Sequence, residues 1–259
     1  MRHVIFTRIA LDNVCPKHAD LQRGDRTESF WASRKVVKHI IEVWRETASL
    51  CYRNQTEGLD FTVVLLYSAV NKDLLDKYEW PPWVEFHECN GQTWSTKGVP
   101  LWVQKNIKPG EAVTLSRIDA DDSWSNDWFA FLNTLSYEEK TLILYNWQHQ
   151  YHMTDDMFSA PVYHPSPMFA TLYFPSFPAD YEPAKAIGKE GTLLGVMGNH
   201  AWYAAAKHVE FGIAYVMMRF RRLDNRESNI MSRFGYIGNK RVDIELIEKS
   251  PRFVGYGDA

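Results

Sequence analysis

Two adjoining stretches decide the fold: Ala112-Val113-Thr114-Leu115-Ser116-Arg117-Ile118, and directly behind it Asp119-Ala120-Asp121-Asp122. The first stretch is apolar and rich in β-forming residues, whereas the second holds three carboxylates. This pattern predicts a buried strand whose carboxyl end opens into a cleft. In open α/β sheets, ligands bind in the crevice outside the carboxyl ends of the strands. We therefore expect the acidic residues to face a binding site.

The composition is that of an ordinary globular protein and argues against several classes of function. The chain has 259 residues, of which 45% are hydrophobic and 24% charged, enough for one large α/β domain or two small ones. A net charge of −3 argues against a nucleic-acid binder. No apolar stretch has the length of a transmembrane segment. Three isolated cysteines (Cys15, Cys51 and Cys89) suggest a reducing compartment, so we expect a cytoplasmic protein.

Strands and helices alternate in the first half of the chain. Helical spacing of apolar residues from Val36 to Ala48 predicts one long helix. The other predicted elements are strands at 4–10, 61–67, 84–88, 112–118 and 141–146 and helices at 72–78 and 128–135, the last capped by Asn126. The resulting βαβαβ order predicts an α/β fold: a doubly wound, mainly parallel sheet with helices on both faces.

The second half has a different pattern. Residues 147–200 contain many Pro, Tyr, Phe and His in short runs, which favours hairpins and loops over helices. The run from Phe211 to Phe220 fits either a strand or a buried helix. We find no linker or repeat, so we expect one continuous domain, 1–259, with halves at 1–146 and 147–259.

The acidic run favours a divalent-metal site over its rivals. Several carboxylates in one cleft repel one another, and a Mg²⁺ or Mn²⁺ ion that grips a nucleotide diphosphate would offset this repulsion. An EF-hand loop would need Gly and Glu where the chain has Trp124 and Ala130. A phosphatase with an aspartyl nucleophile usually has its acid pair on the first strand. A solvated loop that caps the next helix remains an alternative.

Aromatic and histidine residues are candidates for further ligand contacts. The chain has 10 Trp, and Phe, Trp and Tyr make up 14% of it. Flat aromatic faces bind sugar rings, but such residues also fill cores, so we expect a core role for most and a ligand role for one or two. His149 and His152 lack further Cys or His at ligand spacing, which argues against zinc.

Five segments of the sequence resemble the motifs of one known protein family. They are Ser116-Arg117-Ile118-Asp119-Ala120-Asp121-Asp122, His3-Val4-Ile5-Phe6-Thr7-Arg8, Trp31 with Arg34, Ser166-Pro167-Met168-Phe169 and Gly198-Asn199-His200. In these segments the chain resembles the rhamnosyltransferase family, which is of the GT-A glycosyltransferase type. The first segment resembles the family's Thr-Arg-Leu-Asp-x-Asp-Asp signature and is the distinctive one. The chain departs from the family at Arg8-Ile9, where Arg-Phe is more usual, and in the loop 11–29.

The resemblance implies a GT-A-like fold and a metal-dependent transfer of rhamnose or another deoxyhexose. The donor would be a nucleotide sugar bound by the first half, and the acceptor a glycan or glycolipid at the second half. It implies Mn²⁺ or Mg²⁺ on Asp121 and Asp122, Asp119 near the ribose or base, and His200 as a further metal or diphosphate ligand. Arg117 and Arg8 are candidates to pair with the diphosphate, because guanidinium matches phosphate geometry. An inverting transfer also needs a carboxylate base for the acceptor, and of Asp155 and Asp156, in the segment expected to border the acceptor, we prefer Asp156.

Each of these roles has a plainer alternative. His200 also fits a hydrogen-bonded loop histidine, and Arg8 and Arg117 fit ordinary ion pairs. Asp155 and Asp156 fit a helix cap or turn. For the whole chain, the alternative is a non-catalytic carbohydrate-binding module, which would use its Trp residues but would not need an acid cluster at a strand end.

Overall fold

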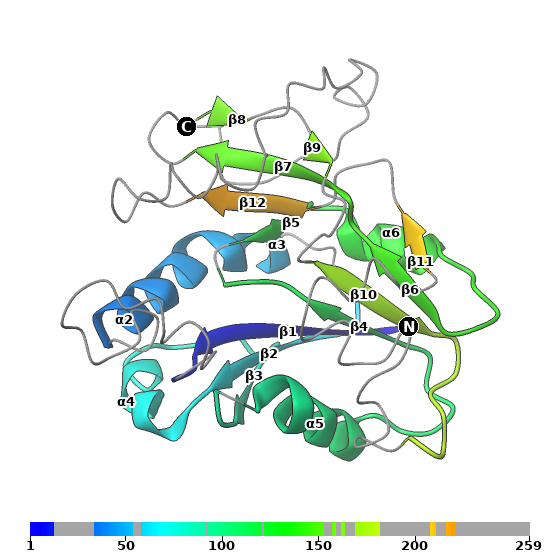
Figure 1. The fold of residues 1–259 in the computed structure, drawn as a ribbon, viewed down its shortest axis with the longest axis horizontal. Coiled ribbons are helices and arrows are strands. Elements are labelled where there is room, and N and C mark those ends of the chain that lie inside the picture. The colour runs from blue at the N-terminus through cyan, green and yellow to red at the C-terminus, as the bar shows by residue number, and fades with distance from the viewer. Residues whose placement is uncertain are drawn as a thin grey trace.

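The centre of the fold is a seven-stranded, mostly parallel sheet (Figure 1). Its strands are β1 (Arg2–Ala10), β2 (Phe61–Tyr67), β3 (Val84–Glu88), β4 (Val113–Arg117), β6 (Thr141–Leu144), β10 (Ala170–Phe174) and β11 (His208–Glu210). The structure is a computed structural model that describes residues 1–12, 34–53, 58–91, 93–120, 122–152, 157–158, 162–163, 169–181, 208–210 and 216–220.

The strand order makes the sheet doubly wound. In space the strands follow β11-β6-β10-β4-β1-β2-β3. β1 pairs in parallel with both β2 and β4, β2 with β3, and β6 with β11, whereas β10 is antiparallel to its neighbours β4 and β6. β2 and β3 therefore lie on one side of β1 and the later strands on the other. The predicted α/β fold with a mainly parallel sheet is confirmed.

Helices cover both faces of this sheet. They are α2 (Arg34–Val43), α3 (Ser49–Arg53), α4 (Lys72–Leu75), α5 (Val99–Asn106) and α6 (Trp128–Thr134), with π-helical turns at Trp44–Ala48 and Trp94–Gly98 and a 3₁₀ turn at Ala69–Asn71. Figure 1 shows α2 and α5 on opposite sides. Ile5 of β1 packs in one buried cluster with Ile41, and Phe6 packs in the other with Trp102 and Val103. Alternation along β1 thus serves two cores.

A second, five-stranded sheet belongs mainly to the later part of the chain. Its strands are β5 (Ser123–Trp124), β7 (Trp147–His152), β8 (Met157–Phe158), β9 (Val162–Tyr163) and β12 (Val216–Phe220). β7 is parallel to β12 and antiparallel to β8 and β9. The antiparallel pairs of β7 with β8 and β9 agree with the hairpins predicted for residues 147–200. β12 also shows that Val216–Phe220, within the ambiguous run Phe211–Phe220, is a strand.

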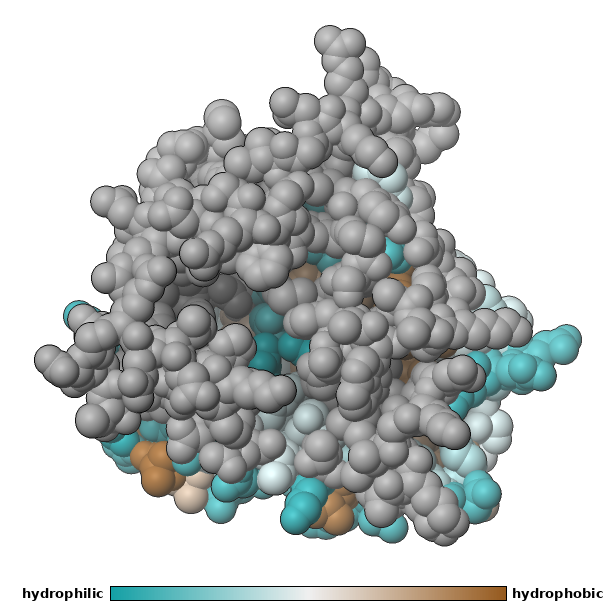
Figure 2. Space-filling model, viewed as in Figure 1, coloured by the Kyte–Doolittle hydropathy of each residue, from teal (hydrophilic) through white to brown (hydrophobic). Residues whose placement is uncertain are grey.

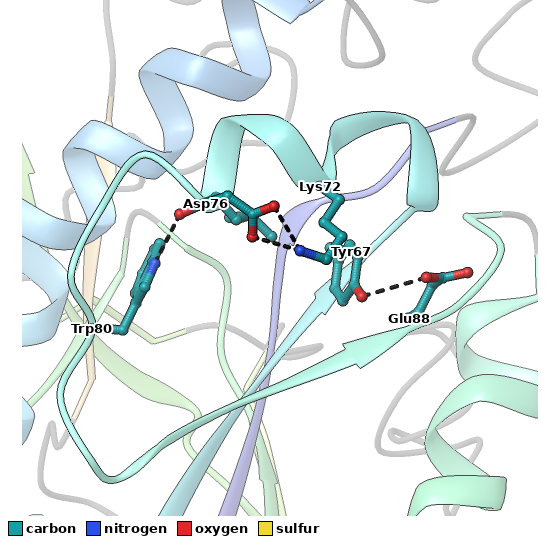
Figure 3. Close-up of polar contacts among 6 residues, drawn as sticks. Tyr67, Lys72, Asp76, Trp80 and Glu88 are labelled. Atoms are coloured by element: carbon teal, nitrogen blue, oxygen red, sulfur yellow. Dashed lines mark hydrogen bonds and ion pairs between the residues drawn. The ribbon is translucent and has the colours of Figure 1, made fainter.

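The helix predicted at 72–78 is shorter in the structure. α4 ends at Leu75, whose carbonyl oxygen accepts a hydrogen bond from the Trp80 indole at 3.0 Å (Figure 3). The Lys72 ammonium contacts the Asp76 carboxylate at 2.6 Å, and Tyr67 donates to Glu88 at 3.4 Å. These contacts close the connection from β2 to β3, and the exposed ion pair adds little stability.

α5 has no counterpart among the predicted elements. Pro100, Gly98 and the pair Pro109-Gly110 give its surroundings the composition of a loop. Pro100 lies in the first turn of α5, where the missing N–H costs no helical hydrogen bond. Parallel strands such as β3 and β4 require a crossover connection, and α5 supplies it.

The predicted cap of α6 is wrong. The residue before the helix is Asp127, and no side chain caps it. The amide of Trp128 instead donates to the carbonyl of Ser125 at 3.1 Å. Because this turn already satisfies the first amide, the Asn126 side chain is not needed there, and its Oδ1 atom is buried.

Few large hydrophobic side chains are exposed among the described residues: Met1, Val70, Phe86 and Leu101. On the face that Figure 2 shows, the hydrophobic residues that are not grey appear as separate spots. Across the described ranges, no helix combines the length and the apolar character needed to cross a membrane.

His3, near the start of β1, is a buried titratable group in the core. Its Nδ1 atom shares a 2.8 Å hydrogen bond with the Thr114 hydroxyl, and its ring stacks on Phe129 at 5.0 Å. Burial, with help from the amino terminus, lowers the pKa of His3 from 6.5 to about 4. His3 therefore stays neutral in the folded protein where the unfolded chain would protonate it.

We predict that His3 makes stability depend on pH. The unfolded chain takes up a proton at His3 below about pH 6.5, whereas the folded protein does so only near pH 4, so stability falls as the pH drops through this window. The His3 contribution between pH 7 and pH 5 should be about 2 kcal/mol. Urea unfolding of the wild type and His3→Asn at both pH values measures it. An equal pH dependence in the two proteins would contradict the assignment.

Candidate functional site

The carboxyl ends of β1 and β4 meet at the point where the chain changes direction across the sheet. The two strands pair in parallel, with Phe6 beside Arg117. β2 and β3 continue the sheet on one side, and β10 and β6 on the other. In open α/β sheets this switch point forms the ligand-binding crevice. Arg8, Arg117, Asp119 and Asp122 all lie at this place.

Two arginines converge on one carboxylate oxygen at this edge. Arg8 Nη2 donates to Asp119 Oδ1 at 2.5 Å, and Arg117 Nη2 lies 3.6 Å from the same oxygen. The Arg8 side chain is 27% exposed and that of Arg117 only 4%. The Arg117 side chain is thus buried at this edge of the sheet, whereas the Arg8 side chain is partly exposed to solvent.

Trp94 lies against both guanidinium groups. The centroid of its ring is 5.2 Å from Arg8 Cζ and 5.5 Å from Arg117 Cζ, within the range of cation–π attraction. Trp94 opens the π-helical turn that leads into α5, and it is 5% exposed. Turns of this kind often mark functional sites.

A backbone hydrogen bond joins Asp119 and Asp122 just after β4. The amide of Asp122 donates to the carbonyl of Asp119 at 3.2 Å, and Asp122 is 4% exposed. β5 follows at once, and its Trp124 stacks on Trp128 at 3.7 Å with the planes 3° apart. Asp122 is therefore held on its N-terminal side by the hydrogen bond to Asp119 and on its C-terminal side by the packing of Trp124.

Three titratable side chains near this edge of the sheet, those of Cys51, Tyr52 and Cys89, are uncharged at neutral pH. Tyr52 lies beside Thr7 and Trp124, and burial raises the pKa of its hydroxyl well above the usual value. Burial also raises the pKa of the thiols of Cys51 and Cys89 to about 12, so neither is a reactive thiolate at neutral pH. The charged groups that the structure describes at Asp119 are the guanidinium groups of Arg8 and Arg117.

A second set of contacts ties the loops after β1, β2 and β3 together. The Ser68 hydroxyl makes a short hydrogen bond to the Asp12 carboxylate and lies 3.2 Å from the Cys89 carbonyl oxygen. Gly91 approaches Asp12 so closely that a Cβ on Gly91 would lie 1.4 Å from the Asp12 carbonyl oxygen. These contacts hold the carboxyl edge of three strands as one unit.

The structure brings together four of the residues expected at the site: Arg8, Arg117, Asp119 and Asp122. The others, Asp121, Asp155, Asp156 and His200, lie outside the described residues. Among the residues that are described, no group of three or more His, Cys, Asp or Glu side chains is placed to hold a metal ion. Of the two described acids of the run, Asp119 faces both arginines and Asp122 is the more deeply buried.

Trp94 and Asp12 are site residues that the sequence pattern did not identify. Each follows a strand of the parallel sheet, Trp94 after β3 and Asp12 after β1. Their positions behind predicted strands were a usable signal, since all such loops emerge at one edge. The aromatic content alone could not distinguish Trp94 from the Trp residues that only fill the core.

Comparison with known proteins adds little. No protein-family model matches the chain, and no curated protein has significant sequence similarity to it. Two similar solved structures are both 4-diphosphocytidyl-2C-methyl-D-erythritol synthases, the second from Anaerococcus prevotii. The first is 12% identical and covers 90% of this chain and 99% of its own, and the second is 13% identical and covers 81% and 86%. Both have a TM-score of 0.34.

We predict that Gly91→Ala strongly destabilises the protein. Relieving a contact of 1.4 Å requires the backbone near Asp12 to move, which should lower the free energy of unfolding by at least about 3 kcal/mol. Gly110 has open space around it but a positive φ of 82°, so Gly110→Ala should cost only about 1 kcal/mol of backbone strain. Denaturant unfolding of both variants tests this, and equal losses would contradict the close approach.

Proposed function

We propose that this chain is a metal-dependent glycosyltransferase. It would move a sugar, rhamnose or another deoxyhexose, from a nucleotide-sugar donor to a glycan or glycolipid acceptor. The observation that carries the proposal is the convergence of Arg8, Arg117 and Asp119 with the buried Asp122 at the switch point of a doubly wound sheet. The resemblance of the 116–122 segment to the rhamnosyltransferase signature supports the choice of sugar.

The charges at this edge suit a donor with a diphosphate. The two positive charges of Arg8 and Arg117 and the three negative charges of Asp119, Asp121 and Asp122 sum to a formal charge of −1. A divalent cation would change this to +1, which favours a pyrophosphate group. Guanidinium groups bind phosphate oxygens with matched geometry. In this proposal the arginines and the metal share the diphosphate.

Asp121 and Asp122 would hold the metal, with His200 as a further ligand. Carboxylate oxygens are the preferred ligands of Mg²⁺ and Mn²⁺, and the burial of Asp122 fits a site that displaces water. When bound, the ion would neutralise charge on the departing nucleotide. Asp119 would stay with the arginines and lie near the ribose or base.

The transfer itself needs a base for the acceptor. The acceptor oxygen would attack the anomeric carbon while the bond from that carbon to the diphosphate breaks, and the acceptor proton would pass to a carboxylate. We propose Asp156 for this role, with Asp155 as the second choice. Both follow β7, on the side of the chain assigned to the acceptor.

The packing of tryptophan weakens the alternative of a non-catalytic carbohydrate-binding module. Such a module would present flat aromatic faces to solvent. Five of the described Trp residues are at most 5% exposed: Trp44, Trp94, Trp102, Trp124 and Trp128. Their main role in the structure is packing, whereas the charged groups gather at one edge.

We predict that nucleoside diphosphates bind in a manner that depends on Mn²⁺ and on Asp122. Calorimetry with UDP, dTDP and GDP, with and without Mn²⁺, should show tighter binding with the metal. Asp122→Asn should weaken this binding by about 10-fold or more, because it removes a charged ligand. The matched control is Asp127→Asn, an exposed acid just beyond the turn, which should bind as the wild type does. Unchanged binding in Asp122→Asn would count against the transferase.

We also predict slow hydrolysis of one class of nucleotide sugar. A transferase without acceptor should release nucleoside diphosphate from its own donor, so a screen that includes the rhamnose donors identifies the sugar. Asp156→Asn should reduce transfer by about 100-fold or more while donor affinity stays within about 3-fold, since a base acts on the acceptor. A carbohydrate-binding module would hydrolyse none of the donors.

A further inference from the structure

The proposed function leaves the position of Trp94 unexplained. Its ring is almost fully buried and lies within 5.5 Å of both guanidinium carbons at the switch point. A guanidinium group over an indole uses its face for the cation–π attraction. Its N–H groups lie in the plane of the group and can still donate sideways. Contact with Trp94 therefore orients an arginine without competing for phosphate.

Asp119 contacts the same two arginines as Trp94. Two arginine side chains held close together repel each other, and the shared oxygen Asp119 Oδ1 offsets that repulsion at 2.5 Å and 3.6 Å. The Trp94 ring lies against both guanidinium groups, and the Asp119 carboxylate attracts the Nη2 atom of each. Arg8 and Arg117 are thereby held as a pair.

The place of Trp94 is itself set by firm backbone contacts. The π-helical turn Trp94–Gly98 closes with a 2.8 Å hydrogen bond from the Lys97 amide to the Thr93 carbonyl. Its last residue, Gly98, packs so tightly that an added Cβ would meet Cys89 Cβ at 2.7 Å. His87 of β3 also bonds the Gly98 carbonyl at 3.0 Å. These contacts attach the turn to β3 and to Cys89 just after it, and they thereby fix the backbone position of Trp94.

We propose that Trp94 is a positioning residue that, together with Asp119, presents Arg8 and Arg117 as a paired clamp for a diphosphate. The inference rests on the proposed function and adds a specificity to it. Two guanidinium groups side by side match two linked phosphates, whereas one phosphate can engage only part of the pair. The clamp therefore selects nucleoside diphosphates over monophosphates. Arg8, the more exposed of the two, makes the outer contact.

The test compares two tryptophans of the same core. Trp94 and Trp102 belong to one hydrophobic cluster, are 5% and 4% exposed, and each lies under an arginine, but the partner of Trp102 is Arg2 at the opposite end of β1. Trp94→Leu and Trp102→Leu therefore remove similar packing. The readout is the ratio of the Kd for the monophosphate to that for the diphosphate. It is measured with Mn²⁺ for dTDP and dTMP, UDP and UMP, and GDP and GMP.

We expect Trp94→Leu to raise the diphosphate Kd by about 10-fold and the monophosphate Kd by less than about 3-fold, which collapses the ratio. Trp102→Leu should leave the ratio at the wild-type value. Trp94→Phe, which keeps a weaker aromatic face, should give an intermediate ratio and replaces Trp94→Leu if that variant does not fold. Circular dichroism checks the fold of each protein.

Two failures are distinguishable. If the wild type binds diphosphates and the Trp94 variants keep its ratio, or if Trp102→Leu lowers the ratio equally, the clamp is overturned while the transferase proposal stands. If the wild type binds no nucleoside diphosphate with Mn²⁺, the proposed function fails and the clamp fails with it.

Discussion

The parallel pairing of β1 with β4 is the constraint on which the rest of the structure depends. It brings Arg8 to Asp119 across 111 positions of the chain, a contact that no local element could make. The same pairing lets Ile5 and Phe6 point into two separate cores, since neighbours on a strand face opposite sides. One strand in the middle of the sheet thus organises both the packing and the charged edge.

The elements that the sequence predicts well are those buried on both faces. β2 matches its predicted bounds, Phe61–Tyr67, because a continuous apolar run leaves few other choices. α5 is different: Pro100 and its neighbouring glycines resemble a loop, and the helix exists because β3 and β4 need a crossover. The antiparallel β10 between β4 and β6 is also invisible locally, since a strand's own pattern does not name its neighbours in space.

The site is predictable in position but not in its internal contacts. A strand ending in Asp119-Ala120-Asp121-Asp122 marks the right edge of the sheet, and the same logic reaches Arg8 at the end of β1. The convergence of both arginines on Asp119, with Trp94 against them, depends on side chains from three separate segments. The periodicity and spacing of residues along the chain do not predict side-chain contacts between such distant segments.

The contacts of Asp119 also change how the acidic run is understood. From the sequence, three neighbouring carboxylates share one repulsion that a metal ion would relieve. In the structure Asp119 already faces two guanidinium groups, so its charge is offset within the protein. In the proposed function, Asp121 and Asp122 would therefore be the acids that hold the cation. This division fits Mg²⁺ or Mn²⁺, which are commonly held by one or two protein carboxylates and complete their shell with phosphate oxygens and water.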